Sequence, residues 1–363
     1  MSLQATWFVL ICGLWSAYFV TEGFDFGVGM LVPVLARSEA DRQAMFGAIG
    51  PVWDGNEVWL LIAGGATFAA FPQWYATMFS GFYVALLAIL VLLIVRVVSF
   101  EWRTKSQHAT WRGIWTWVNV SASYGAPLLW GIGLSSLLYG TPIAANQEFT
   151  GSFWSLFSVY SVLAGLAVVA LFALHGAVYL GLRGGQDEVR VRAQALAFRL
   201  AVPAVLLGAA FLVATLIVGV TRNHQGVWSG LIVLALALVA AAVALVFAWL
   251  RRPALAFVAT AATIVLAVVM LFVELYPRVM VSSSAFANSL TVSNAASGHY
   301  TLTVMTVATA LLLPVVFVYQ FWTYRVFRVR VTGEASVTPA DILAPRAGRP
   351  EDPPSGGGAG SDA

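Results

Sequence analysis

The sequence is poor in charged residues and holds almost no cysteine. Asp, Glu, Lys and Arg make up only 10% of its 363 residues, whereas soluble domains carry about 25%, so a soluble globular domain is excluded. The single cysteine, Cys12, excludes an intrachain disulfide, and its apolar neighbours predict an inert buried thiol. The formal net charge of +3 is small and does not indicate nucleic acid as a partner.

Motifs for covalent or metal chemistry are also missing. The sequence contains no CxxCH, HExxH, P-loop or Ser-His-Asp arrangement. Of its 4 histidines, only His175 falls well inside an apolar run, and haem iron needs axial ligands such as His or Met. One such histidine could ligate one haem at most. We therefore expect this chain to bind no haem and no metal, and we expect His175 to be a hydrogen-bonded packing residue.

Long apolar runs dominate what is present. Hydrophobic residues make up 60% of the chain and the mean hydropathy is +0.85. The runs do not alternate between apolar and polar residues as barrel strands do, so we predict an all-α polytopic membrane protein. About nine runs reach the roughly 20 residues that a bilayer requires. They lie at 6–35, 47–71, 75–100, 113–138, 153–182, 198–221, 226–250, 254–276 and 300–328.

The basic residues orient these predicted spans. With the N-terminus outside, sixteen of the 19 basic residues fall in inside segments, Arg222 and Arg278 fall outside, and Arg96 lies within a span. This asymmetry fits the positive-inside rule and predicts a cytoplasmic C-terminus. Residues 332–363 are rich in Pro, Gly and Asp and predict a disordered cytoplasmic tail. Residues 1–331 would form a single transmembrane domain.

Several charged residues interrupt the apolar runs near one predicted depth. They are Glu22 and Asp25 in 6–35, Asp54 and Glu57 in 47–71, and Arg96 toward the cytoplasmic end of 75–100. Glu101 follows that span, and we expect it near the surface. Each acid pair is spaced i, i+3, so its two members share a helix face. Charges inside a membrane are costly and are by default a functional hypothesis. The pattern favours a proton or cation path from the cytoplasm.

Two other interpretations of this charge pattern are open. One is a structural lock, in which Arg96 pairs with one acid and fixes the helix packing. The other is a secondary transporter that uses the acids as its coupling site. However, no pair of Gly- or Pro-broken helices recurs in two halves of the sequence, as inverted-repeat transporters tend to show.

Two further features predict packing rather than a site. Gly23 and Gly27 form a GxxxG pattern, and Gly64–Gly65 lie in the second span. Such small residues let helix backbones approach closely. Glu274 and Arg278 lie at the outer end of the eighth span, where we expect an interfacial structural role.

Five segments resemble subunit II of the cytochrome bd quinol oxidases. They read TEGFDFGVGML, GPVWDGNEVWLLIAGGATFAAFPQWYA, SGFYVALLAIL, RVVSFEWRTK and YPRVMVSSSAFANSLT. The similarity extends over nearly the whole chain except the tail. The second segment is long and highly specific for that family.

The resemblance implies a terminal oxidase of the bacterial plasma membrane. Such an oxidase oxidises quinol, reduces O₂ to water and builds a proton gradient without pumping. A partner subunit I would hold two b-type haems, one d-type haem and the quinol-oxidising loop. This chain would be its nine-helix partner without haem. Small accessory membrane subunits and a bound lipid or quinone would be further partners.

The resemblance also assigns roles to the intramembrane charges. By motif, Glu22 and Asp25 match the two acids of the family's first helix, Asp54 matches the acid of its WDGN motif, and Arg96 matches an arginine at the end of the third helix. Glu22 stands where relatives often carry Asp, which keeps the charge. We therefore predict a cytoplasmic proton path with Arg96 as its charge partner, and a purely structural subunit is the alternative. The predicted path comprises Glu22, Asp25, Asp54, Glu57 and Glu101.

Overall fold

Eleven α-helices make up most of the described part of the chain. The computed structural model describes residues 2–183 and 187–326. The helices are α1 (Leu3–Leu35), α2 (Glu39–Ile49), α3 (Trp53–Ala70), α4 (Pro72–Gly81), α5 (Tyr83–Trp102), α6 (Ala109–Tyr139), α7 (Val159–Arg183), α8 (Asp187–Arg222), α9 (Val227–Trp249), α10 (Pro253–Leu275) and α11 (His299–Val326). Short 3₁₀ turns occur at η1 (Arg103–Lys105), η2 (Phe153–Leu156) and η3 (Phe286–Asn288).

Seven helices of the described part are long and apolar enough to cross a membrane: α1, α5 with η1, and α7 to α11. The prediction of an all-α polytopic membrane protein is therefore confirmed. The other two predicted spans, 47–71 and 113–138, correspond mainly to α3 and α6, which are not among the seven. Both are less apolar, because α3 carries Asp54, Asn56 and Glu57 and α6 carries Arg112 and Asn119.

Two predicted spans are broken in the structure. The span 47–71 divides into the end of α2 and all of α3, because Pro51 has no backbone N–H to continue the hydrogen bonds of α2. The start of α2 has its own signal, a capping box between Ser38 and Asp41. The span 75–100 divides at Phe82 into α4 and α5. The break at Gly50 matters most, because it moves the start of α3 to Trp53.

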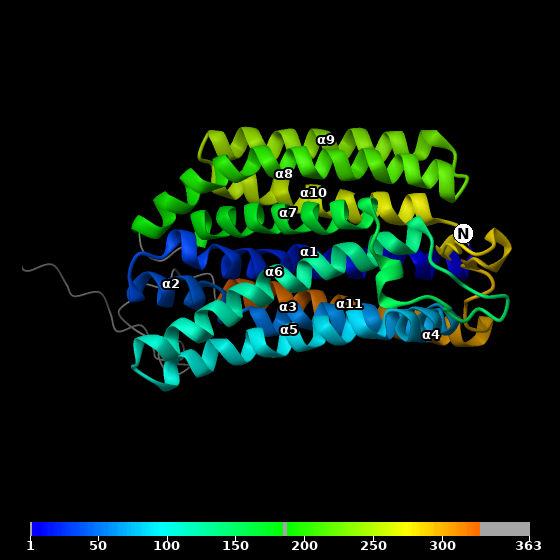
Figure 1. The fold of residues 1–363 in the computed structure, drawn as a ribbon, viewed down its shortest axis with the longest axis horizontal. Helices are drawn as coiled ribbons and strands as arrows, with labels where there is room; N and C mark the ends of the chain where they lie inside the picture. The colour runs from blue at the N-terminus through cyan, green and yellow to red at the C-terminus, as the bar shows by residue number, and fades with distance from the viewer. Residues whose placement is uncertain (1, 184–186, 327–363) are drawn as a thin grey trace, which may run out of the picture. The chain divides into compact units, whose positions relative to one another are not determined.

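Helix α1 runs through the middle of the bundle, with α7 to α10 on one side and α3, α4, α5 and α11 on the other (Figure 1). Its closest approach is to α7. A Cβ atom on Gly27 would lie 2.8 Å from the Cα of Gly176, so both positions need glycine. The expected close packing at the GxxxG pattern is confirmed. Gly64 and Gly65, in contrast, have no atom of another residue within 4 Å of an added Cβ.

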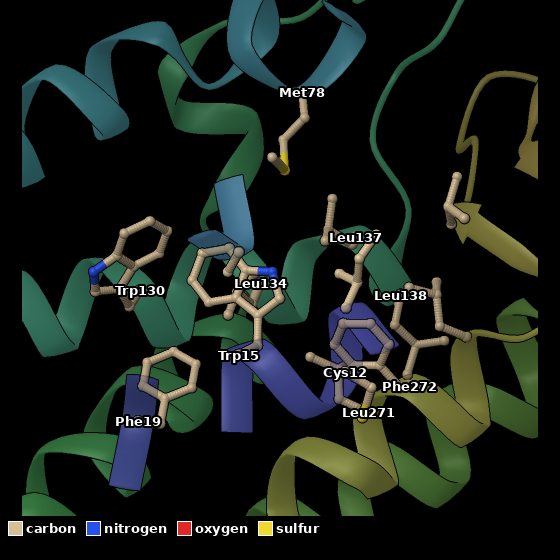
Figure 2. Close-up of a cluster of buried hydrophobic side chains, with 14 of the residues drawn as sticks. Cys12, Trp15, Phe19, Met78, Trp130, Leu134, Leu137, Leu138, Leu271 and Phe272 are labelled. Atoms are coloured by element: carbon tan, nitrogen blue, oxygen red, sulfur yellow. The ribbon is translucent and has the colours of Figure 1, made fainter. Parts of the chain in front are cut away.

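A layer of aromatic and aliphatic side chains fills the space around α1 on the N-terminal side of its acids. Figure 2 shows Cys12, Trp15 and Phe19 of α1 near Trp130 of α6 and Phe272 of α10. The rings of Trp15 and Trp130 meet edge to face with their centroids 5.0 Å apart. Cys12 is buried and free, as the sequence predicted. This packing holds α1 rigidly on the approach to Glu22.

Helix α11 has little cover from the rest of the chain. Only Leu302 of its 28 residues is buried in the described structure. Large apolar side chains are exposed along its length, among them Leu311, Val318 and Trp322. An apolar helix with so few partners offers a large surface for another protein or for lipid.

The two ends of the bundle differ in structure. Short strands β1 (Arg278–Met280) and β2 (Leu290–Thr291) pair antiparallel in the connection between α10 and α11, near the N-terminal end of α1 (Figure 1). Helix α2 lies at the opposite end. The predicted tail, 332–363, lies outside the described residues.

Candidate functional site

An ion pair between two wholly buried side chains forms the centre of the candidate site. Glu22 lies in the middle of α1 and Arg96 lies in the second-last turn of α5, and both have 0% side-chain exposure. Nη1 of Arg96 donates a hydrogen bond to Oε1 of Glu22. The guanidinium also lies over the ring of Phe26, 4.4 Å from its centroid. Because both side chains are removed from water, other protein groups must replace the hydration of the two charges.

The backbone of Arg96 is held by polar residues from neighbouring turns. Nδ2 of Asn119, on α6, donates to the Arg96 carbonyl oxygen at 3.3 Å and to Oγ of Ser99 at 2.9 Å. The hydroxyl of Ser99 in turn donates to the same carbonyl. These bonds connect α5 to α6 at the level of the arginine and fix the direction in which its side chain points.

Asp25 carries the second buried carboxylate of α1, and its hydrogen-bond partner is an amide rather than Arg96. Nδ2 of Asn56, on α3, donates to Oδ2 of Asp25 at 2.7 Å. The side-chain oxygen of Asn56, Oδ1, accepts from the hydroxyl of Tyr324 at 2.6 Å and from Nε2 of Gln320 at 3.5 Å. Asp25, Asn56 and the two α11 side chains therefore connect three helices through one amide.

Glu57 is the third carboxylate of the cluster and the only one open to the surface. Its Oε1 lies 3.6 Å from Nη1 of Arg96, and its side chain is 24% exposed. Two carboxylates, from Glu22 and Glu57, thus lie within ion-pair distance of one guanidinium, and that of Asp25 interacts with it electrostatically at longer range. Five atoms of these four side chains have no hydrogen-bond partner among the described residues: Oε2 of Glu22, Oδ1 of Asp25, Oε1 of Glu57, and Nε and Nη2 of Arg96. Such atoms can bind water or a transferable proton.

The structure does not bring Asp54 and Glu101 into this cluster. Asp54 is exposed and lies in the first turn of α3, one turn before Glu57. The break at Gly50 starts α3 at Trp53 rather than six residues earlier, so Asp54 lies near the end of this helix. Glu101 is 74% exposed and pairs with Lys105 at 3.1 Å.

Three polar residues of the site were not predicted from the sequence: Asn56, Gln320 and Tyr324. A signal for Asn56 is present in α3. Its buried residues Trp59, Ala63, Thr67 and Ala70 repeat about once per turn, and Asn56 continues the same stripe. Gln320 and Tyr324 are spaced i, i+4 and so share one face of α11, but nothing in the sequence relates that face to α3.

The donor set around His175 does not fit a haem. Its Nδ1 lies 2.7 Å from Oγ1 of Thr260 and its Nε2 lies 3.2 Å from the carbonyl oxygen of Val20, so both ring nitrogens have partners. Its ring stacks on Phe257 with the centroids 4.5 Å apart. The other histidines are exposed, and the described residues contain no group of three or more His, Cys, Asp or Glu that could hold a metal ion.

Comparison with known proteins gives one consistent result. Residues 3–327 match the family described as cytochrome bd terminal oxidase subunit II. Cytochrome bd ubiquinol oxidase subunit 2 of Bacillus subtilis (strain 168) is 40% identical over 342 residues, covering 93% of this chain and 99% of that protein. Cytochrome bd-I ubiquinol oxidase subunit 2 of Escherichia coli (strain K12) is 34% identical over 367 residues, covering 92% and 96%.

A solved structure shares the fold. The bd oxidase from Geobacillus thermodenitrificans includes a chain that superposes with a TM-score of 0.72. The match covers 90% of this chain and 99% of that chain at 18% identity. The helical arrangement around α1 is therefore one that an experimentally solved membrane complex also uses.

Proposed function

Because the chain belongs to the family of cytochrome bd terminal oxidase subunit II, we propose that it is the haem-free membrane subunit of a quinol oxidase and carries protons toward the O₂-reducing site. The family's members are subunits of an oxidoreductase complex in bacterial membranes, and this chain is a multi-pass membrane protein of that kind. A subunit of this family works beside a partner subunit I. Haem and quinol chemistry then belong to that partner.

The nearly uncovered helix α11 supports an extensive contact with the partner. Its apolar side chains, with exposed residues of α3 and α5 such as Leu61 and Leu90, give an apolar side to the bundle. An oxidase of this class needs haem next to its proton supply, so we place subunit I against this side. Tyr324 and Gln320 of α11 would then connect the interface to Asn56 and Asp25.

The proposed proton path starts at the exposed carboxylate of Asp54. Glu57 lies one turn further into α3 and is partly exposed. From Glu57 the path continues to the buried carboxylates of Glu22 and Asp25, which share the same arginine environment. Three carboxylates cannot all be ionised around a single guanidinium in a low dielectric, so at least one of them carries a proton. We leave Glu101 outside the path because it lies at the surface.

The helix lengths support nine membrane crossings. Helix α3 has 18 residues and α6 has 31, or about 27 and 46 Å at 1.5 Å per residue, and both run alongside the seven apolar helices (Figure 1). Nine crossings with the N-terminus outside put α2 and its Arg42 in the cytoplasm. The proposed proton path then begins, at Asp54, on the cytoplasmic side of the membrane, which supplies the protons.

An apolar cavity of about 490 Å³ lies between α3, α4 and α5. Gly64 and Gly65 lie in its wall, together with Trp15, Tyr75 and Trp130. We propose that it holds the tail of a lipid or of a quinone, as a structural component of the complex. This assignment explains why the glycine pair of α3 has no close helix neighbour.

The single observation that carries the proposal is the buried arginine paired with the carboxylates of Glu22 and Glu57, near that of Asp25, with Glu57 reaching the surface. The test measures O₂ consumption per haem against pH in assembled complexes carrying Asp54→Asn, Glu57→Gln or Glu22→Gln. Each amide keeps the shape of the side chain but cannot exchange a proton. We expect normal haem content and reduced turnover, with a deeper loss at higher pH, where protons are scarcer.

Two comparisons sharpen this test. Glu101→Gln removes an exposed carboxylate outside the cluster and should leave turnover unchanged. Combining Glu57→Gln with Glu22→Gln should be little worse than either single change, because both block one route. A purely structural subunit predicts the reverse pattern, with poorer assembly and normal turnover per haem. Wild-type turnover in both Asp54→Asn and Glu57→Gln would falsify the path.

A further inference from the structure

A charged cavity lies at the α2 end of the bundle, outside the acid cluster. Its volume is about 570 Å³, and it lies where α2, η1 and the start of α6 meet beside the end of α1. The side chains that matter in its wall are Glu39 and Arg42 of α2, Arg103 of η1, and Arg112 and Trp117 of α6. We propose that this cavity binds the phosphate headgroup of an anionic phospholipid.

The charges of the cavity are unbalanced. Among the described residues, Glu39 is the only carboxylate in its wall, and three guanidinium groups face it. Nη2 of Arg103 donates to the two carboxylate oxygens of Glu39 at 2.5 and 2.6 Å. The Nη1 atoms of Arg112 and Arg42 lie farther from this carboxylate, at 3.7 Å from Oε1 and 3.5 Å from Oε2. One carboxylate neutralises one arginine, so two positive charges remain for a ligand. Phosphate oxygens are the acceptors that guanidinium groups pair with best.

The three arginines differ in how firmly they are held. The side chain of Arg103 is 4% exposed and its Nε donates to Oγ1 of Thr116 at 3.0 Å. Arg42 and Arg112 are 37% and 21% exposed. Nε and Nη2 of Arg112 donate to the Ser106 carbonyl oxygen and to Oε1 of Gln107, and both partners are uncharged. Arg103 therefore anchors Glu39 inside the fold, and the positive charges of the other two guanidinium groups lack a close carboxylate.

The start of α6 adds donors to the same cavity. Ala109, its first residue, lies in the wall, and no side chain caps the helix at His108. The first backbone N–H groups of a helix lack internal partners and carry a partial positive charge, which favours an anion there. These donors and Arg112 belong to α6, Arg42 belongs to α2, and all of them line one opening.

The surroundings favour a lipid headgroup over free phosphate. Trp117 of the cavity wall is 61% exposed, and Ile114, on the next turn of α6, is 55% exposed. Trp102 and Trp111 stack beside them with ring centroids 6.2 Å apart. Tryptophans gather at the level of the lipid headgroups, and basic pockets beside membrane helices bind anionic headgroups. Acyl chains can therefore follow the exposed apolar side chains of α6 away from the arginines.

The experiment titrates lipid onto the purified, delipidated oxidase complex and counts bound molecules by native mass spectrometry. The lipids are phosphatidylglycerol, cardiolipin and, as a zwitterionic control, phosphatidylcholine. We expect the anionic lipids to bind in preference to phosphatidylcholine. Arg42→Gln with Arg112→Gln should weaken their binding by about thirtyfold, because each arginine contributes about one factor of five to six near an anionic lipid.

A matched control removes the same charge elsewhere. Arg251→Gln with Arg252→Gln removes two exposed arginines from the turn between α9 and α10, and it should leave the binding unchanged. The haem spectrum checks that each complex is assembled. Should the double variant fail to assemble, Arg42→Gln alone, at the most exposed of the three arginines, should still weaken binding about fivefold.

Three outcomes would overturn the proposal. The first is equal binding of phosphatidylcholine, and the second is unchanged anionic-lipid binding in the Arg42 and Arg112 variants. The third is that an excess of inorganic phosphate displaces the lipid completely and binds with the same dependence on the two arginines. That result would assign the cavity to a free anion.

Discussion

At the scale of single residues, Arg96 determines the character of the buried cluster. Its guanidinium is the only positive charge within ion-pair distance of Glu22 and Glu57 in the described residues. Removing one partner of a buried pair leaves an uncompensated charge, which costs about 3–5 kcal/mol. We therefore expect Arg96→Leu to lower the unfolding temperature of the assembled complex markedly, or to lower its yield.

Two variants serve as controls for this prediction. Arg37→Leu replaces an exposed arginine whose side chain makes no contact in the cluster, and it should change the unfolding temperature little. Arg96→Lys keeps the positive charge and should recover part of the stability. An Arg96→Leu complex as stable as the wild type would show that the acids are neutral without the arginine.

Asp41 gives a prediction about pH outside the membrane-spanning helices. Burial opposes its ionisation, but hydrogen bonds from Arg192 and from the backbone N–H groups of Arg37 and Ser38 outweigh burial, so the pKa of Asp41 lies below its usual value. A lowered pKa contributes stability that is fully present above the unfolded-state pKa of about 3.9 and is lost as the pH falls through the folded-state pKa.

Asp41→Asn should therefore destabilise the protein at neutral pH. The difference in unfolding temperature between variant and wild type should shrink as the pH falls well below about 4. Glu148→Gln, a change at an exposed carboxylate, provides the comparison for general acid effects. A difference that stays constant across this range would mean that the charge of Asp41 contributes nothing beyond its shape.

The buried acids show which parts of the site the sequence could predict. Glu22, Asp25 and Arg96 were predicted because a charge in an apolar run has few alternatives to a buried partner. The exposure of the Asp54 side chain was not predicted, because it depends on where α3 begins and on which face of the helix the residue lies. Two residues along a helix correspond to a rotation of about 200°, so Asn56 faces the core of the bundle while Asp54 faces outward. The contact of Tyr324 with Asn56 joins residues 268 apart in sequence, which no local pattern encodes.

At the scale of elements, the approach of α1 and α7 determines where the acids lie. Nine predicted apolar runs already implied a helical bundle, but their order of packing was not predictable from hydropathy. Gly27 and Gly176 allow the two backbones to touch, and α7 then covers α1 along the turns that carry Glu22 and Asp25. The GxxxG pattern predicted a close approach but did not identify its partner helix.

This contact leads to a prediction with an internal control. In Gly27→Ala the new Cβ would contact the Phe172 carbonyl oxygen and lie 2.8 Å from backbone atoms of Gly176, and backbone cannot move aside easily. We expect a loss of about 1–3 kcal/mol, as for other overpacked cores, seen as a lower unfolding temperature. Gly65→Ala, where the added Cβ meets nothing within 4 Å, should be neutral or stabilising by up to about 1 kcal/mol. Equal effects of the two changes would contradict the close approach.

At the scale of the whole molecule, the helices differ in how much of their surface the rest of the chain buries. Helices α1 and α7 are largely buried within the described structure, whereas α11 has a single buried residue. An integral membrane protein can expose apolar side chains to lipid, so exposure alone does not identify a protein contact. The distinguishing feature is that α11 also carries Gln320 and Tyr324, which contact the polar cluster through Asn56. A lipid-facing helix has no reason to hold such groups, whereas a helix between two subunits can connect the cluster to the partner.

The last prediction concerns which side of the bundle meets subunit I. A photo-crosslinking side chain at position 318, where Val318 is 69% exposed on α11, should join this chain to the haem-bearing subunit. The same group at position 239, where Val239 is 62% exposed on α9, should react only with lipid. The product is identified by its mass and its haem absorbance after gel filtration. Crosslinks to the partner from position 239 but not from position 318 would move the interface to α9. The path from Asp54 through Glu57 to Glu22 would then end on the side of the bundle away from the haem.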